Sequence, residues 1–104
     1  MTYLYQKKIT LTATEEVDKR VVRYSDIDLN GHLNNTKYVE FIVDTHEPEF
    51  YRHHKIASIE INYDHEIRGS QEVVLYSNKN NPEVITGKVN GNTHFTSLLT
   101  YEHR

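Results

Sequence analysis

The hydrophobic pattern of this chain changes its period after the segment with helical spacing, and that change constrains the fold more than any other feature of the sequence. Apolar residues within the range 38–43 follow the i, i+3, i+4 spacing of a helix with a wide buried face. The period changes after Ile56: from Ser58 through Tyr63, polar and apolar residues alternate, which is the pattern of a strand with one buried face. A helix followed by several strands predicts an α+β domain in which the sheet covers the helix.

Turn residues separate the expected strands. Arg68-Gly69-Ser70 and the polar residues 78–82 interrupt the alternation, and Asn90-Gly91 suits a type I′ hairpin turn because both of its central residues need positive φ. We therefore expect a helix from about Asn35 to His46 and a second short helix that opens at Pro48. Four strands of an antiparallel meander should follow, over residues 56–63, 72–77, 83–89 and 93–101.

The first part of the chain predicts less regular structure. Residues 8–12 alternate as a short strand does, and the polar residues 14–16 follow as a surface linker. Residues 17–24 carry β-branched side chains and predict a strand that ends near Ser25. A chain of 104 residues is long enough for one core and too short for two ordinary domains. We divide it into an N-terminal extension or linker, residues 1–17, and one domain, residues 18–104.

Composition excludes several classes of protein. The formal net charge is −3 and the charges are interleaved, so the sequence predicts no nucleic-acid interface and no polybasic membrane anchor. No apolar run reaches the length of a membrane span. The chain has no cysteine, which excludes disulfides, thiolate metal sites and a cysteine nucleophile. We expect a soluble, cytoplasmic protein without a cofactor.

Polar side chains concentrate in residues 24–38, ahead of the expected helix. If residues 28–32 are extended, Asp28, Asn30 and His32 alternate in step and project to the same side of the backbone. A carboxylate, an amide and an imidazole would then share one small volume. With Asn34 or Asn35 as the N-cap, the cluster lies at the amino end of the helix, where free N–H groups and the helix dipole favour negative charge.

The same cluster admits other interpretations. The run from Asp26 to Gly31 matches the start of an EF-hand calcium loop, but the twelfth position is Lys37, where that site needs a bidentate Glu. The remaining histidines form no H-x-x-x-H pair on one helix face and have no cysteine partners, so we predict no zinc site. An Asx-rich turn with a helix cap is the simplest alternative, because Asp and Asn are favoured at both places.

Two separated runs resemble a known family. The run RYSDIDLNGHLNNTKYVEFIVD, residues 23–44, resembles the signature of the acyl-ACP thioesterase family, whose catalytic half carries a similar S-D-x-D-x-N-x-H-x-N-N-x-x-Y string. The run HKIASIEINYDHEIRGS, residues 54–70, resembles the second motif of that family, at a similar distance downstream. The D-x-x-G-H-x-N-N core is also similar to single-domain acyl-CoA thioesterases. The resemblance implies a single hotdog domain, in which a curved antiparallel β-sheet wraps a long central helix.

The resemblance also implies roles for individual residues. Three positions of the first motif and one of the second match the family's catalytic residues: Asp28, Asn30, His32 and Glu66. Asp26 matches a recurrent position to which we assign a structural role. Plant members carry a cysteine after the glutamate, whereas this chain has Ile67, so a cysteine mechanism is excluded. Family members carry two hotdog domains in one chain, and this sequence resembles only the second.

The implied activity is hydrolysis of a fatty acyl thioester, acyl-ACP or acyl-CoA, to a free fatty acid and the thiol carrier. Hydrolysis needs an activated water or a carboxylate nucleophile, and donors for the developing oxyanion. We assign Glu66, or failing it Asp28, as the base or nucleophile, while Asn30 and His32 orient water and polarise the carbonyl. N–H groups near Asn34 and Asn35 are the expected oxyanion donors. The expected substrate-binding residues are Asn34, Asn35 and Tyr38.

Two alternatives keep the same fold without hydrolysis. One is a non-catalytic acyl-binding or regulatory hotdog domain, and the other is the inactive half of a two-hotdog enzyme. A dehydratase or hydratase would carry His-Pro-rich motifs, which this sequence lacks. Because a lone hotdog leaves one sheet edge uncovered, we expect a second copy to pair with it in a two-fold symmetric homodimer.

Overall fold

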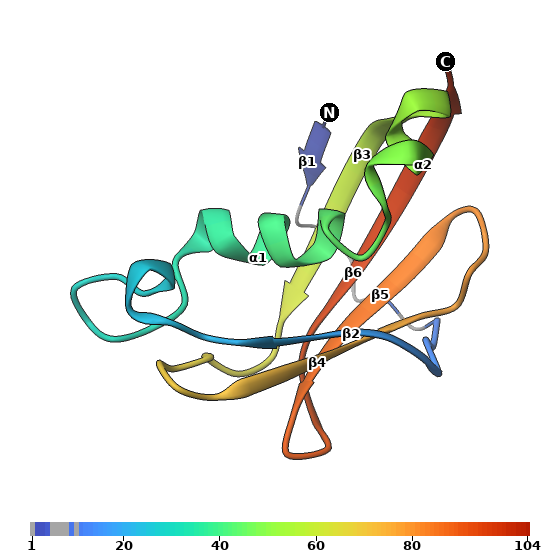
Figure 1. Cartoon of the computed structure of the whole chain (residues 1–104). Coiled ribbons are helices and arrows are strands. Elements are labelled where there is room, and N and C mark those ends of the chain that lie inside the picture. Colours follow the sequence, from blue (N-terminus) through green and yellow to red (C-terminus); the bar gives the residue numbers. More distant parts are fainter. Residues whose placement is uncertain (1, 5–8, 10) are drawn as a thin grey trace.

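A curved sheet carries two short α-helices in the computed structural model, which describes residues 2–4, 9 and 11–104 (Figure 1). In this part of the chain the strand order across the sheet is β1-β3-β6-β5-β4-β2. The elements in chain order are β1 (Thr2–Leu4), β2 (Glu15–Val21), the 3-10 helix η1 (Tyr24–Asp26), α1 (Asn35–Val43), α2 (Pro48–His53), β3 (His54–Tyr63), β4 (Glu72–Ser77), β5 (Glu83–Val89) and β6 (Asn92–His103).

The order of the strands differs from the meander that the sequence predicted. Strands β4, β5 and β6 do follow one another as antiparallel neighbours, and Asn90 and Gly91 turn between β5 and β6 with φ of 51° and 80°. Strand β3, however, pairs with β6, while β4 pairs with β2. Residues 64–71 therefore cross the end of the sheet instead of closing a hairpin. The expected β3–β4 neighbourhood is wrong, and the crossing segment carries Glu66 towards the loop that precedes α1.

Helix α1 is shorter than expected. It begins at Asn35, where the Oδ1 atom of Asn34 caps it by accepting the N–H of Thr36 at 3.1 Å. It has nine residues and ends at Val43, not at His46. The Oγ1 hydroxyl of Thr45 donates to the carbonyl of Ile42 at 2.7 Å. This bond satisfies one of the carbonyls that the last turn of a helix leaves without a backbone partner, and the helix ends there. The prediction of a long central helix is wrong for this chain.

The core lies between α1 and one face of the sheet. Eight apolar residues of α1, β3, β4 and β6 are each 5% exposed or less: Tyr38, Phe41, Ile42, Ile59, Ile61, Val73, Leu75 and Leu99. Gly87 lies directly beneath the ring of Phe95, where a Cβ atom would collide with it. The absent side chain lets Phe95 reach the ring of Tyr38, with the centroids 5.3 Å apart.

The amino-terminal part is described incompletely. The strand predicted over residues 8–12 includes positions 8 and 10, which lie outside the described residues. The strand predicted at residues 17–24 is observed as β2 (Glu15–Val21), paired with β4 at the edge of the sheet. The division of the chain at residue 17 stays a prediction. Within the described ranges, neither helix is long and apolar enough to cross a membrane.

Candidate active site

Two aspartates shape the loop between β2 and α1. Asp26 is 8% exposed, and its Oδ2 atom accepts the N–H of Arg23 at 2.8 Å. Its Oδ1 atom lies 3.7 Å from the Nζ atom of Lys37, and its carbonyl accepts the N–H of Asn34 at 2.9 Å. These contacts tie the start of the loop to the first turn of α1.

Asp28 closes a tight turn further along the same loop. Its Oδ1 atom accepts the N–H groups of Asn30 at 2.9 Å and of His32 at 3.1 Å. Gly31 has a φ of 78°, a left-handed conformation that glycine adopts without strain. The extended course expected for residues 28–32 is therefore wrong. Because the backbone turns here, the two-residue repeat of a strand does not set the directions of Asp28, Asn30 and His32.

A cavity of about 300 Å³ opens beside this turn, at the amino end of α1. It is lined by Asp28, His32, Leu33, Asn35, Tyr38, Tyr63, Asp64, His65 and Glu66. The cavity thus brings together three of the four predicted catalytic residues, while Asn30 at the exposed turn is not part of its lining. Of the predicted substrate-binding residues, Asn35 and Tyr38 line it, whereas the side chain of Asn34 caps the helix.

Backbone contacts hold the two sequence motifs together. The N–H of Leu33 donates to the carbonyl of Ile67 at 2.7 Å, and the N–H of Gly69 donates to the carbonyl of Gly31 at 3.2 Å. An antiparallel bridge also pairs His32 with Arg68. The crossing segment 64–71 is thereby fastened alongside the turn, although the two segments are far apart in sequence.

The side chains of His32 and Glu66 meet at the mouth of the cavity. The Nε2 atom of His32 lies 3.2 Å from the Oε2 atom of Glu66, and these side chains are 26% and 64% exposed. No other described side chain bonds the Glu66 carboxylate, so its second oxygen is free to meet a water or a substrate. A carboxylate with a free oxygen beside an imidazole can take a proton from water or attack a carbonyl carbon.

Tyr38 supplies a neutral hydroxyl at the same cavity. Burial raises the pKa of its phenol, the facing N–H of Ile67 lowers it and the nearby charge of Glu66 raises it further, so the pKa lies above its ordinary value. The hydroxyl is therefore protonated near neutral pH and can donate a hydrogen bond.

Four of the lining residues were not among the predicted site residues: Leu33, Tyr63, Asp64 and His65. Asp64 and His65 follow β3 directly, and the rings of His65 and His94 lie 5.3 Å apart. Hydrophobic periodicity does not identify functional residues in loops. The position of Asp64 and His65 next to Glu66 in the second motif was the signal that could have identified them. Among the residues described, there is no group of three or more side chains suited to holding a metal ion.

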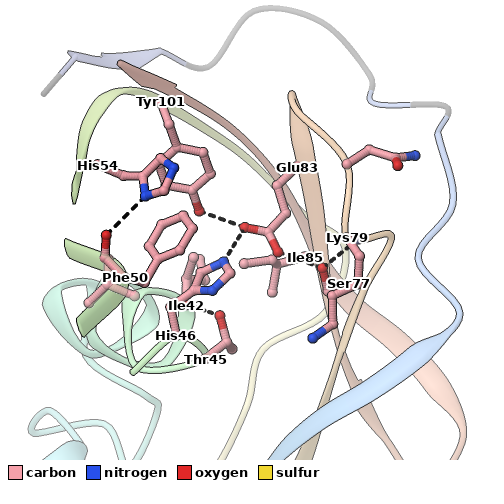
Figure 2. A network of polar contacts seen from close by, with 12 residues as sticks. Ile42, Thr45, His46, Phe50, His54, Ser77, Lys79, Glu83, Ile85 and Tyr101 are labelled. Atoms are coloured by element: carbon pink, nitrogen blue, oxygen red, sulfur yellow. Dashed lines mark hydrogen bonds and ion pairs between the residues drawn. The ribbon is translucent and has the colours of Figure 1, made fainter. Parts of the chain in front are cut away.

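A second carboxylate–histidine pair lies at the other end of α1 (Figure 2). Glu83 is 2% exposed, and its Oε1 atom lies 2.7 Å from the Nε2 atom of His46. The hydroxyl of Tyr101 donates to the same oxygen at 2.6 Å, and the hydroxyl of Ser77 donates to Oε2 at 2.5 Å. Burial alone would raise the pKa of Glu83, but the hydrogen bonds from His46, Ser77 and Tyr101 outweigh it, and the pKa lies below its ordinary value.

The surroundings of this second pair are aromatic. The ring of Phe50 stacks on His46 at 3.8 Å and on His54 at 4.1 Å between centroids. Figure 2 shows the histidine, the tyrosine and the serine converging on the carboxylate from different elements. No pattern in the sequence pointed to a role for this group. Its members come from distant parts of the chain, and no local pattern joins them.

Comparisons with known proteins agree on one family. Residues 9–99 match the family described as the acyl-ACP thioesterase C-terminal domain. Oleoyl-acyl carrier protein thioesterase 2, chloroplastic, of Arabidopsis thaliana is 25% identical over 81 residues, which is 78% of this chain and 22% of that protein.

Solved structures give the same answer for the fold. An acyl-ACP thioesterase from Bacteroides thetaiotaomicron superposes with a TM-score of 0.84 at 29% identity, over 93% of this chain and 41% of that one. A thioesterase from Thermus thermophilus, crystallised with coenzyme A and Zn, superposes with a TM-score of 0.73 at 19% identity, over 81% of this chain and 74% of that one. This last likeness shows the fold alone.

The chain spans less than half of the plant and Bacteroides relatives. The match over residues 9–99 nevertheless covers most of it, and its antiparallel strands agree with those of hotdog-fold thioesterases. The chain therefore belongs to the acyl-ACP thioesterase family, and it corresponds to the C-terminal domain of that family.

Proposed function

We propose that this chain hydrolyses a fatty acyl thioester, acyl-ACP or acyl-CoA, to the free fatty acid and the thiol. The observation that carries the proposal is the contact of 3.2 Å between His32 and Glu66 at the mouth of a cavity of about 300 Å³. Membership of the acyl-ACP thioesterase family supports the class of substrate.

Glu66 is the base in this mechanism. Its carboxylate takes a proton from a water, and the water oxygen forms a bond to the thioester carbon while the carbonyl π electrons move to oxygen. When the resulting tetrahedral intermediate collapses, the C–S bond breaks and the thiolate takes the proton back from Glu66. His32 orients the carboxylate and the water. The sum is one thioester and one water converted to one acid and one thiol.

Asp28 has a structural role in the proposed mechanism. Its Oδ1 atom already accepts two backbone N–H groups, and this supports a role in shaping the turn rather than in taking a proton. Asn30 lies outside the cavity lining, so we assign it no contact with the reacting atoms. Asn35 and Tyr38 line the cavity and remain candidates for substrate contact.

A second copy of the chain completes the pocket in our proposal. In the described part of the chain, β1 pairs with β3 only from Ser58 to Glu60, which leaves other edge positions of β3 for a partner. Open strand edges are templates for pairing, and identical surfaces close most simply as a two-fold dimer. Sedimentation should show a dimer at micromolar concentration; a monomer there would contradict this part.

The test compares turnover of acyl-CoA and acyl-ACP by the chain and by its Glu66→Gln variant. We expect the variant to lose about 10²- to 10⁴-fold in rate, because a positioned base contributes that much. The matched control is Glu49→Gln, since Glu49 is 68% exposed and lies 3.4 Å from His53, away from the cavity lining. Binding of the fatty acyl thioester without turnover would instead identify a non-catalytic acyl-binding domain.

A further inference from the structure

A second cavity adjoins the candidate active site along helix α1. Its volume is about 280 Å³. It is lined by Asn35, Thr36, Val39 and Tyr63. Two of these residues, Asn35 and Tyr63, also line the cavity that contains Glu66. The two cavities therefore meet, and a molecule that reacts at Glu66 can extend into the second one, which we call the α1 groove.

Helix α1 supplies one wall of this groove. Asn35, Thr36 and Val39 lie on the same helix face, because residues three and four apart are neighbours on the surface of a helix. A helix rises about 1.5 Å per residue, so Val39 lies roughly 6 Å further along the axis than Asn35. Val39 is half-buried and packs against the core, which holds its methyl groups in place. The wall thus begins with an amide beside the active cavity and continues to an apolar side chain.

Tyr63 supplies the part of the groove that comes from the sheet. It is the last residue of β3, and Glu66 follows three positions later. Its ring packs edge-on against the ring of Tyr38, with 5.0 Å between the centroids, and this contact fixes its orientation. The side chain is nevertheless 37% exposed. An aromatic surface in a fixed position is therefore accessible to a ligand where the two cavities meet.

The charges of the lining distinguish the α1 groove from another neighbouring cavity. A thioester has two arms, the acyl chain and the thiol carrier, and a cavity of about 590 Å³ also adjoins the active cavity through Asp28. Hydrocarbon placed against the Asp28 carboxylate would remove water from a charge, which is costly. None of the described residues that line the α1 groove carries a charge. An acyl chain is therefore bound more favourably in the α1 groove, which leaves the other cavity for the more polar carrier.

We propose that the α1 groove binds the acyl chain of the thioester and that Val39 determines which chain lengths it accepts. This inference rests on the proposed thioesterase function. With the thioester carbon beside Glu66, the chain passes between Asn35 and Tyr63 and lies along α1 towards Val39. Each methylene that contacts the groove leaves water, so binding strengthens with chain length until the chain extends past Val39.

The first test fills the groove with Val39→Phe. We expect kcat/KM for dodecanoyl-CoA to fall about 10- to 200-fold, the range by which a single methylene changes kcat/KM in an apolar pocket. The value for butyryl-CoA should stay nearly unchanged, because its short chain makes few contacts with the groove. Glu40→Phe is the matched control: it adds the same ring at the next position of α1, where the side chain is exposed and outside the groove lining. It should change neither value.

A labelling experiment locates the acyl chain without turnover. The protein has no cysteine, so Val39→Cys, made together with Glu66→Gln, presents a single thiol to a maleimide reagent. Dodecanoyl-CoA should slow this labelling as it occupies the groove, whereas butyryl-CoA should not. Labelling of Glu40→Cys, made in the same background, should proceed at the same rate with either compound. The smaller side chain also keeps the experiment valid if Val39→Phe fails to fold.

The two measurements separate this inference from the proposed function. If the chain does not hydrolyse thioesters but dodecanoyl-CoA protects Val39→Cys, hydrolysis fails and the acyl-chain site stands. If the chain hydrolyses thioesters while dodecanoyl-CoA leaves the labelling unchanged, only the acyl-chain site is overturned. Protection combined with an unaltered chain-length preference in folded Val39→Phe would overturn the role of Val39 in selecting chain length. The absence of both hydrolysis and protection would overturn the function and the inference together.

Discussion

Helix α1 has a carboxylate–histidine pair near each end, and the two pairs differ in almost everything except composition. At the amino end, Glu66 is 64% exposed and meets His32 at 3.2 Å through one oxygen. At the carboxyl end, Glu83 is 2% exposed and both of its oxygens accept hydrogen bonds, from three side chains in all: His46, Ser77 and Tyr101.

The difference separates a group that can react from one that stabilises the fold. An ionised carboxylate in the core needs its oxygens satisfied, and Glu83 therefore has none left for a substrate. Glu66 keeps one oxygen free and stays in contact with water, so its charge costs little to maintain. Exposed ion pairs contribute only about 0–1 kcal/mol to stability. Activity should therefore depend on the first pair and stability on the second.

The largest effect should come from the histidine of the exposed pair. His32→Gln should lower kcat about 10²- to 10⁴-fold, because the imidazole orients the base and the water. The free energy of unfolding should change by less than about 1 kcal/mol, since the Glu66 carboxylate of the pair is 64% exposed and water screens its charge. Thioester turnover and urea unfolding measure the two quantities. His46→Gln is the control and should give the opposite result, reduced stability with unchanged turnover.

Glu83→Gln should be the most damaging change at the buried pair. The amide replaces one acceptor oxygen with an NH₂ group that faces donors, so we expect the free energy of unfolding to fall by about 3 kcal/mol. Urea unfolding at neutral pH measures the loss. A loss below about 1 kcal/mol would show that the network can rearrange around the amide, contrary to a fixed buried carboxylate.

Acid should remove the stabilisation that the buried Glu83 carboxylate contributes to the fold. The pKa of Glu83 is lower in the folded protein than its ordinary value of 4.5, so the carboxylate stabilises the fold above that value. This contribution is lost as the pH falls below 4.5 through the folded-state pKa. The stability difference between the unaltered chain and Glu83→Gln should therefore shrink when unfolding is measured at progressively lower pH. A stability difference between the two proteins that stays constant with pH would contradict this prediction.

Asp28→Asn should have the smallest effect. An asparagine keeps the Oδ1 acceptor that holds the N–H groups of Asn30 and His32, so the turn should survive. We expect the rate to stay within about tenfold and the stability within about 1 kcal/mol. Thioester turnover by Asp28→Asn, measured beside that of Glu66→Gln, tests this prediction. If Asp28→Asn is as inactive as Glu66→Gln, Asp28 is the base and the roles assigned to the two carboxylates must be exchanged.

Part of the site could be predicted from the sequence through its motifs. Resemblance singled out Asp28, His32 and Glu66, and the structure places all three around one cavity. Asn30 and Asn34 were singled out by the same strings, yet one lies at an exposed turn and the other caps α1. A motif gives the identity of its residues but not the direction in which each side chain points. Here that direction follows from the turn, which the hydrogen bonds from two backbone N–H groups to Asp28 hold in place.

The sequence by itself determined the local features. The switch in hydrophobic period selected the helix and the strands, Asn34 set the start of α1, and Asn90-Gly91 set the final hairpin. Each depends on neighbours within a few residues, so periodicity and turn chemistry are sufficient to predict it.

Only the tertiary structure decided where α1 ends, that β3 lies beside β6, and that His32 meets Glu66 while His46 meets Glu83. These outcomes depend on strand pairing between distant segments and on the path of residues 64–71 across the end of the sheet. Many pairings of the same strands bury the same apolar faces, and the choice among them is made by the whole folded chain, which no local pattern encodes.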